Sequence, residues 1–168
     1  MKEPDRIARN TQRLGECFPT FAKRVADVIK EMEALGFRPR IQDAHRTIEQ
    51  QLEDFNKRTT TVKFGFHNVT SAGGKLESLG VDVLDDDHPV GNVPRKYLIT
   101  LASVAQKHGL HSGIFFFKKE PPPGTRQALQ AAVDALNFDP HITIGFDPTH
   151  LEPIGLTIAE AKAGKRPT

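Results

Sequence analysis

Apolar and polar residues are spaced along this chain with two different periods, which predict helices and strands in turn. Between Pro19 and Gly36 the apolar residues recur every three or four positions, the period of an amphipathic helix. These residues are Phe21, Val25, Val28, Ile29, Met32 and Leu35. Gly36 stands where glycine commonly ends a helix. The pattern therefore predicts a helix over residues 19–36 with one face on a core.

Shorter patterns predict the remaining elements. Thr47, with Gln50 three residues on, has the capping-box pattern that starts a helix. Apolar spacing predicts two more helices, over 97–109 and 125–136. Runs of β-branched and aromatic residues predict strands at 37–44, 79–84, 111–117 and 141–146. Loops are expected at 58–77 and 147–153. One or two helical turns on the surface are expected at 157–163.

The order of these elements predicts the fold class. Helices and strands follow one another without a regular βαβ rhythm, which favours an α+β fold over a doubly wound sheet. We therefore expect a small, mainly antiparallel central sheet with flanking helices. The 168 residues fit one domain, 1–168, and are enough to build a core without disulfide or metal support. A bound metal would then serve chemistry rather than stability.

Composition narrows the classes of function. The 23 basic and 21 acidic residues are interspersed, so no footprint for nucleic acid is expected. No apolar run approaches the roughly 18 residues of a membrane span. The single cysteine, Cys17, excludes an intrachain disulfide and a cysteine-rich metal cluster, and it is expected to pack in the core rather than to act as a nucleophile. Histidine, aspartate and glutamate remain as metal ligands.

The N-terminal residues 1–16 are polar and charged where a secretory signal needs an apolar segment. The sequence thus predicts no signal peptide. A protein of this kind would be made in the cytoplasm and, if its substrate lies outside the cytoplasm, would reach it only after release or delivery.

Two of the seven histidines stand in contexts that indicate metal chemistry. His150 follows Asp147 by three residues, so the histidine could bind a metal while the carboxylate takes a proton from the bound water. The alternative is a turn between Pro148 and Pro153 in which Asp147 caps the backbone. His67 lies in the segment FGFHN, far from His150 in the sequence.

Asp82 and Arg46 are the other candidates. Asp82 lies between Val81 and Val83 in an apolar run, where a buried carboxylate needs a cation or an arginine as partner. The alternative is an aspartate on the solvent face of the strand. Arg46, at a strand-to-helix junction, could bind a substrate carboxylate or stabilise an oxyanion. Its alternative is a plain salt bridge to Glu49 or Glu53.

Three segments of the chain resemble known sequence motifs and occur in the same order as those motifs. Residues 44–51 (AHRTIEQQ) resemble a G-[YF]-R-[ST]-x-x-x-Q motif, His67 with residues 78–82 (SLGVD) resembles S-x-H-x-x-G-x-A-x-D, and residues 147–150 (DPTH) resemble [DE]-x-x-H. Residues 109–113 (GLHSG) are similar to a G-L-x-x-G motif. These motifs, in this order, are those of the zinc D-Ala-D-Ala carboxypeptidase and L-alanyl-D-glutamate endopeptidase family. That family includes phage endolysins and vancomycin-resistance dipeptidases, and it shares its fold with hedgehog signalling domains.

The resemblance, over about residues 15–155, implies a fold and a set of roles. It implies Zn²⁺ held by His67, Asp82 and His150, with Asp147 as general base and Arg46 as stabiliser of substrate or transition state. Three protein ligands and an open position are typical of catalytic zinc. Relative to the family, residues 68–77 are an insertion that we expect to form a longer hairpin returning Asp82 to His67. A second insertion, about 118–140, adds a helix expected to shape the substrate groove.

The resulting hypothesis is a zinc metallopeptidase that hydrolyses stem peptides of bacterial peptidoglycan, as an L-Ala-D-Glu endopeptidase or a D-Ala-D-Ala carboxypeptidase. A phage-type endolysin or a delivered cell-wall effector is expected, acting as a monomer without nucleic-acid or membrane partners. The alternative is a non-catalytic zinc-binding or cell-wall-binding module of the same fold. A metal-free adaptor is disfavoured by the balanced charge and by the presence of one tyrosine and no tryptophan.

Overall fold

Four strands and six α-helices are formed by the described residues of the computed structural model, which are 1–57, 60, 62–88 and 91–168. The strands are β1 (Pro39–Asp43), β2 (Val81–Asp85), β3 (Leu110–Ser112) and β4 (His150–Pro153). The helices are α1 (Glu3–Leu14), α2 (Pro19–Ala34), α3 (Ile48–Asn56), α4 (Arg95–Lys107), α5 (Thr125–Ala135) and α6 (Ile158–Lys162), with short 3-10 turns η1 (Phe66–Asn68) and η2 (Gly113–Phe115).

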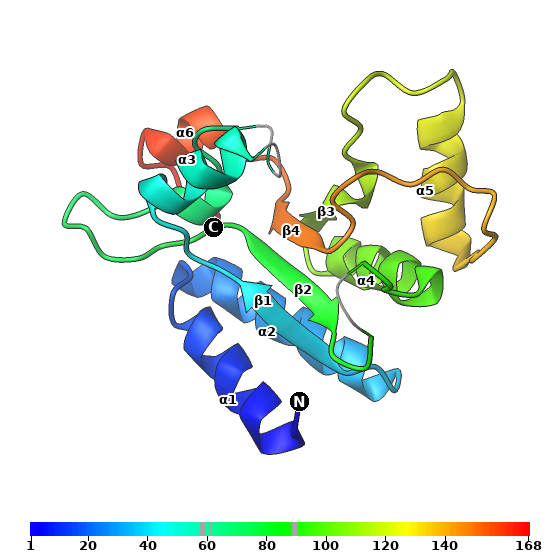
Figure 1. Ribbon diagram of the computed structural model, residues 1–168, viewed down its shortest axis with the longest axis horizontal. Coiled ribbons are helices and arrows are strands. Elements are labelled where there is room, and N and C mark those ends of the chain that lie inside the picture. The colour runs from blue at the N-terminus through cyan, green and yellow to red at the C-terminus, as the bar shows by residue number, and fades with distance from the viewer. Residues whose placement is uncertain (58–59, 61, 89–90) are drawn as a thin grey trace.

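The strands form one antiparallel sheet in the order β1-β2-β4-β3. In Figure 1, α2 lies behind β1 and β2, and α5 stands to one side of the sheet, beside α4. The core between helices and sheet is apolar and includes Phe21 and Met32 of α2, Val81 and Val83 of β2, and Leu101 of α4. The predicted α+β class, an antiparallel sheet with flanking helices, is confirmed.

Strand register brings the polar residues of the predicted site together. Asp82 on β2 is paired with His150 on β4, and on its other side with Asp43 on β1. A break in the register lies between Ile41 and Asp43, just before the chain leaves β1 toward α3. The middle of the sheet is therefore where residues from β1, β2 and β4 meet.

The first helix, α1, was not predicted, because its buried face is polar. Arg6 and Asn10 are buried, with only 2% and 6% of their surface exposed. Asn10 accepts a hydrogen bond from the backbone N–H of Ile41 at 2.7 Å and donates one to the carbonyl of Pro39 at 3.0 Å. Arg9 donates to the carbonyl of Ile41 at 2.9 Å. Hydrogen bonds to β1, rather than an apolar stripe, hold α1 in place.

Of the predicted strands, the one at 141–146 is wrong and the one at 111–117 is too long. Residues 141–146 form no strand; the last strand is β4, within the segment 147–153 predicted as a loop. Ile142 and Ile144 pack against the core from an irregular segment, and Gly145 donates a backbone hydrogen bond to the carbonyl of Ile114 at 2.6 Å. The predicted strand at 111–117 is the short β3 followed by η2.

The helix predictions are confirmed within a few residues. The predicted helix at 19–36 is α2, and those at 97–109 and 125–136 are α4 and α5. The capping box of Thr47 and Gln50 starts α3 as expected. Of the predicted loop at 58–77, residues 58, 59 and 61 lie outside the described residues. In the described part of the chain no helix is long and apolar enough to cross a membrane.

Candidate metal centre

Asp82 lies on β2, and its two carboxylate oxygens face different partners. Oδ1 points toward His67 and His150, and Oδ2 accepts a hydrogen bond from Nη2 of Arg46 at 2.7 Å. The side chain is 16% exposed. Burial alone would raise the pKa of Asp82, but the charges and hydrogen bonds of the two histidines hold it well below its usual value. The carboxylate has both an arginine and a cluster of histidines as partners, so it does not face open solvent.

His67 lies on η1, which is tied to the start of α3. The Asn68 amide donates to the carbonyl of Arg46 at 2.9 Å, and the backbone N–H of Arg46 donates to the carbonyl of His67 at 2.9 Å. Nδ1 of His67 bonds to the carbonyl of Ala44. A carbonyl only accepts, so Nδ1 carries a proton and Nε2 is the ring nitrogen that faces Asp82 and His150.

The insertion after His67 returns the chain to the site as a hairpin. Thr70 and Leu76 form an antiparallel bridge, and the backbone N–H of Glu77 donates to the carbonyl of Val69 at 3.1 Å. Leu79 then donates to the carbonyl of Phe66 at 2.9 Å. The ten residues from 68 to 77 thus separate His67 from Asp82 in the sequence without separating them in space.

His150 is the first residue of β4. It turns Nδ1 toward the other candidate ligands, whereas His67 turns Nε2 toward them. Its Nε2 lies 3.2 Å from Oε2 of Glu152, so Nδ1 faces Asp82 and His67. Burial alone would lower the pKa of His150, but hydrogen bonds with Asp82 and Glu152 raise it to about 10. Residues 150 and 152 share one face of the strand, so the sequence would have indicated Glu152 had the segment been recognised as a strand.

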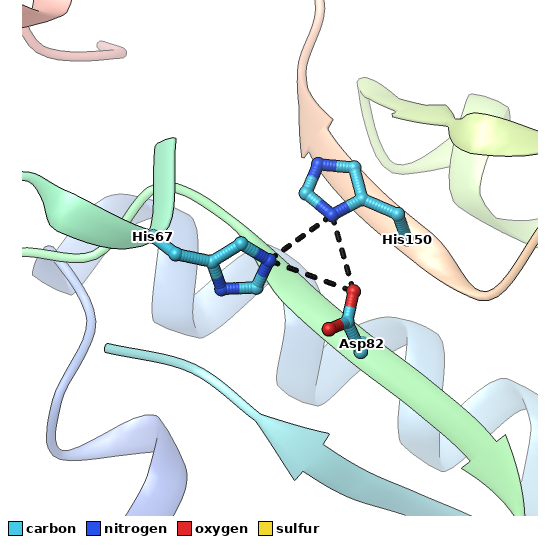
Figure 2. A group of neighbouring side chains, drawn as sticks. All are labelled: His67, Asp82 and His150. Atoms are coloured by element: carbon cyan, nitrogen blue, oxygen red, sulfur yellow. Dashed lines mark hydrogen bonds and ion pairs between the residues drawn. The ribbon is translucent and has the colours of Figure 1, made fainter. Parts of the chain in front are cut away.

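The three ligand atoms lie close together and form a triangle (Figure 2). Nε2 of His67 lies 3.2 Å from Nδ1 of His150 and 3.5 Å from Oδ1 of Asp82, and the remaining side is 3.2 Å. Donor atoms about 2.0–2.2 Å from a tetrahedral zinc ion lie about 3.3–3.6 Å from one another. The side lengths and the two-histidine, one-carboxylate set therefore fit a metal ion, and this group of residues could hold one.

Two glycines allow the close approach of backbone at this triangle. A Cβ at Gly80 would lie 3.0 Å from Cε1 of His150 and 3.2 Å from Cδ2 of His67. A Cβ at Gly113 would lie 2.1 Å from the carbonyl oxygen of Asp147, a distance that real structures do not show. Larger residues at either position would displace the candidate ligand side chains or the turn that precedes His150.

Arg46 is bound by carboxylates. Besides Asp82 it bonds to Asp43 through Nε, and its Nη1 lies 3.8 Å from Asp54. These partners replace Glu49 and Glu53, which we considered as its salt-bridge partners. The guanidinium fixes the plane of the Asp82 carboxylate, so that only Oδ1 is turned toward the histidines.

Asp147 occupies the turn before β4. Its backbone carbonyl accepts from the N–H of His150 at 3.1 Å, while its carboxylate has no hydrogen-bond partner among the described residues. Burial raises the pKa of this carboxyl group. The side chain lines the same cavity as the three candidate ligands. It is thus available to a water or a ligand in that cavity.

The cavity has a volume of about 550 Å³ and one aromatic wall. The wall consists of Phe115, Phe116, Phe117 and His111, and Phe146 lies at the same cavity. The ring of Phe116 is 5.9 Å from that of His150, and His111 stacks on Phe115 at 5.6 Å. This aromatic wall is not apparent from the sequence, because residues 111–117 have the pattern of a regular strand.

The chain is similar to the crystal structure of the Serratia marcescens L-Ala D-Glu endopeptidase ChiX, with a TM-score of 0.53 and 14% sequence identity over 91% of this chain and 90% of that one. The chain has the ChiX fold. The resemblance predicted from the sequence motifs is confirmed at the level of the fold.

A second solved structure has a lower TM-score against this chain. It is the vancomycin resistance D,D-pentapeptidase VanY from a VanB-type resistance cassette, an E175A mutant in complex with Zn(II), with 16% identity and a TM-score of 0.42 over 85% of this chain and 74% of that one. No protein-family model and no curated protein sequence matches the chain.

Proposed function

We propose that this chain is a zinc peptidase that hydrolyses peptide bonds in the stem peptides of bacterial peptidoglycan. The observation that carries the proposal is the triangle of His67, Asp82 and His150, with side lengths of a tetrahedral zinc site, open to a cavity that Asp147 also lines. A fold shared with an L-Ala D-Glu endopeptidase supports the same substrate class.

The residues of the chain have separate roles in this mechanism. A bound zinc ion supplies Lewis-acid polarisation of the scissile carbonyl and makes water more acidic. Asp147, whose carboxylate has no hydrogen-bond partner in the part of the chain that the structure describes, takes a proton from the attacking water and returns it to the leaving amine. Arg46 holds Asp82 in place through Oδ2. We also propose, as predicted from the sequence, that Arg46 contributes positive charge beside the developing oxyanion.

The test combines metal content with turnover. The purified protein is expected to hold about one zinc per chain, to release peptides from purified peptidoglycan, and to lose this activity with a chelator. Mass spectrometry of the new ends distinguishes L-Ala-D-Glu cleavage from D-Ala-D-Ala cleavage. Zinc binding without any cleavage would favour a binding module, and absence of zinc binding would reject the three ligands.

A matched pair of variants tests the role of Asp147. Asp147→Asn is expected to keep its zinc and its fold but to lower kcat/KM at least a hundredfold, because general-base catalysis contributes about 10²–10⁴-fold. Asp139→Asn, in the exposed segment before the site, changes the same charge and is expected to keep full activity. Equal loss in both variants would contradict the assignment.

A further inference from the structure

Ser78 is a buried serine beside the candidate metal centre. It follows the inserted segment 68–77, and the motif S-x-H-x-x-G-x-A-x-D has a glycine at this place. None of the surface of Ser78 is exposed to solvent. A buried hydroxyl is costly unless it is hydrogen-bonded. The groups that this hydroxyl binds therefore indicate why the chain has a serine here.

The backbone of Ser78 is fixed by the link between α1 and α2. Its N–H donates to the carbonyl of Glu16 at 3.0 Å, and its carbonyl accepts from the N–H of Phe18 at 3.0 Å. These bonds form a parallel bridge between Ser78 and Cys17, which is buried as well. The side chain of Ser78 therefore projects from a backbone that is held by a segment outside the metal centre.

The hydroxyl of Ser78 lies between two carbonyl groups. Its Oγ is 3.0 Å from the carbonyl oxygen of Ala44 and 2.8 Å from that of Gly80, and it accepts from the N–H of Gly80 at 3.3 Å. A serine has one O–H proton and two lone pairs, so the two carbonyls share the proton while a lone pair takes the amide. One side chain thus connects the chain after β1 with the chain before β2.

The carbonyl of Ala44 is also the partner of His67. Nδ1 of His67 donates to it, while the other ring nitrogen faces Asp82 and His150 (Figure 2). A carbonyl oxygen has two lone pairs, so it can accept from both Ser78 and His67. Partners of this kind orient the ring of a histidine ligand and fix which nitrogen is left to bind a metal. The position of the Ala44 carbonyl therefore sets the direction of Nε2.

Gly80, the other partner of the hydroxyl, lies against both histidine rings. A Cβ at this position would be 3.0 Å from Cε1 of His150 and 3.2 Å from Cδ2 of His67. The N–H and the carbonyl of Gly80 both contact the hydroxyl of Ser78. The hydroxyl thus also fixes the stretch of backbone against which the two rings rest.

We propose that Ser78 is a positioning residue, which holds the carbonyl of Ala44 against Nδ1 of His67 and so presents Nε2 to a bound zinc ion. This inference deepens the proposed function and rests on it. The inserted residues 68–77 lengthen the covalent connection between His67 and Asp82, and a longer connection restrains its ends less. The hydroxyl supplies a short link between the two sides of the site in its place.

The experiment measures zinc affinity and stability separately in the full chain. Ser78→Ala is expected to weaken zinc binding about tenfold in competition with a chromogenic chelator, because the carbonyl that orients His67 loses its support. Ser78→Gly, which has the residue of the motif, is the second variant and is expected to show the same loss. In the zinc-loaded protein, nitrogen-edited NMR should show faster exchange of the Nδ1 proton of His67 with water in both variants. Urea denaturation of the zinc-free protein gives the stability of each variant.

Thr100→Ala is the matched control, because it also removes a buried hydroxyl that is bonded to a carbonyl. Thr100 is 4% exposed, donates to the carbonyl of Lys96 at 2.7 Å within α4, and does not line the cavity. Its loss is expected to lower the stability but to leave the zinc affinity and the proton exchange of His67 unchanged. A Ser78→Ala variant that loses stability and keeps its zinc affinity would overturn the inference, as would an equal loss of affinity in Thr100→Ala.

Peptide release from peptidoglycan distinguishes this inference from the proposed function. Zinc affinity that depends on Ser78, without cleavage by the wild type, would support the positioning role and reject the peptidase. Cleavage by a wild type whose zinc affinity does not depend on Ser78 would reject the positioning role alone. A wild type that binds no zinc would reject both.

Discussion

His150 turns Nδ1, rather than Nε2, toward the other two candidate ligands, and Glu152 is the residue that fixes this choice. The carboxylate bonds to Nε2 from the same face of β4. Partners of this type orient a histidine ligand, and removing them commonly costs ten- to hundredfold in metal affinity. A residue outside the triangle of candidate ligands therefore orients one of its members.

Glu152→Ala is expected to weaken zinc binding about ten- to hundredfold, because the imidazole of His150 loses its orienting acceptor. Competition with a chromogenic chelator measures the affinity. Glu53→Ala, an exposed carboxylate on α3, serves as the control and is expected to leave the affinity unchanged. An unaltered affinity in Glu152→Ala would show that His150 is held by its neighbours in β4 alone.

Cys17 is expected to resist thiol reagents in the folded protein. Burial raises the pKa of its thiol from 9.0 to about 12, and only the thiolate reacts. At pH 8, below both values, a three-unit rise lowers the thiolate fraction about a thousandfold. Labelling with a chromogenic disulfide should be that much slower than in guanidinium-unfolded protein. Comparable rates would mean that the N-terminal part of the chain opens readily.

At the scale of single residues, the sequence was informative where a side chain conflicts with its surroundings. Asp82 between two valines indicated a buried partner, and the structure gives it Arg46 and two histidines. Glu152 could not be found in this way, because a carboxylate inside a proline-bounded segment looks like an ordinary surface residue. Its role depends on strand alternation that the prolines at 148 and 153 concealed.

At the scale of secondary structure, helices with an apolar stripe could be predicted from the sequence. Helix α1, which contacts the sheet through polar side chains, could not. The face of α2 is apolar, and its prediction was confirmed. By contrast, α1 is fixed by hydrogen bonds from Arg6, Arg9 and Asn10 to the backbone of β1, which hydrophobic periodicity does not detect. The strand predicted at 141–146 is wrong because its two isoleucines, which are partly buried, pack against the core without strand pairing.

Asn10→Ala is expected to destabilise the protein by about 2 kcal/mol, because the buried N–H of Ile41 loses its acceptor. Thr11→Ala, at an exposed position of the same helix, should stay within about 0.5 kcal/mol of the wild type. Urea denaturation followed by circular dichroism measures both. Similar stabilities for the two variants would mean that α1 contributes little to the fold.

At the scale of the whole molecule, the candidate ligands tie together parts of the chain that are distant in the sequence. His67 comes from η1, Asp82 from β2 and His150 from β4, so a metal bound to all three would join segments up to 83 residues apart. A ligand that binds only the folded state stabilises that state by a free energy that grows with the logarithm of the ratio of ligand concentration to Kd. Metal occupancy should therefore be visible in the unfolding of the entire chain.

Zinc at about a thousand times its Kd is expected to raise the stability by about 4 kcal/mol, which corresponds to a rise in Tm of about 8–16 °C. Calorimetry with and without a chelator measures the difference. His67→Ala lacks one ligand, and its Tm should not respond to the chelator. A wild-type Tm that is insensitive to both zinc and chelator would reject a site formed by these three segments.

The attachment of α1 to β1 also bears on how the protein behaves at high concentration. β1 is an edge strand, and edge strands offer unpaired backbone groups onto which a second chain can add in the manner of fibril growth. Here side chains of α1 already hold the carbonyls of Pro39, Ile41 and Gln42 and the N–H of Ile41. The first helix therefore protects the edge strand from pairing with a second chain. A chain shortened past residue 14 would expose the unpaired backbone groups of β1 and would be prone to aggregate, even if the remaining fold survived.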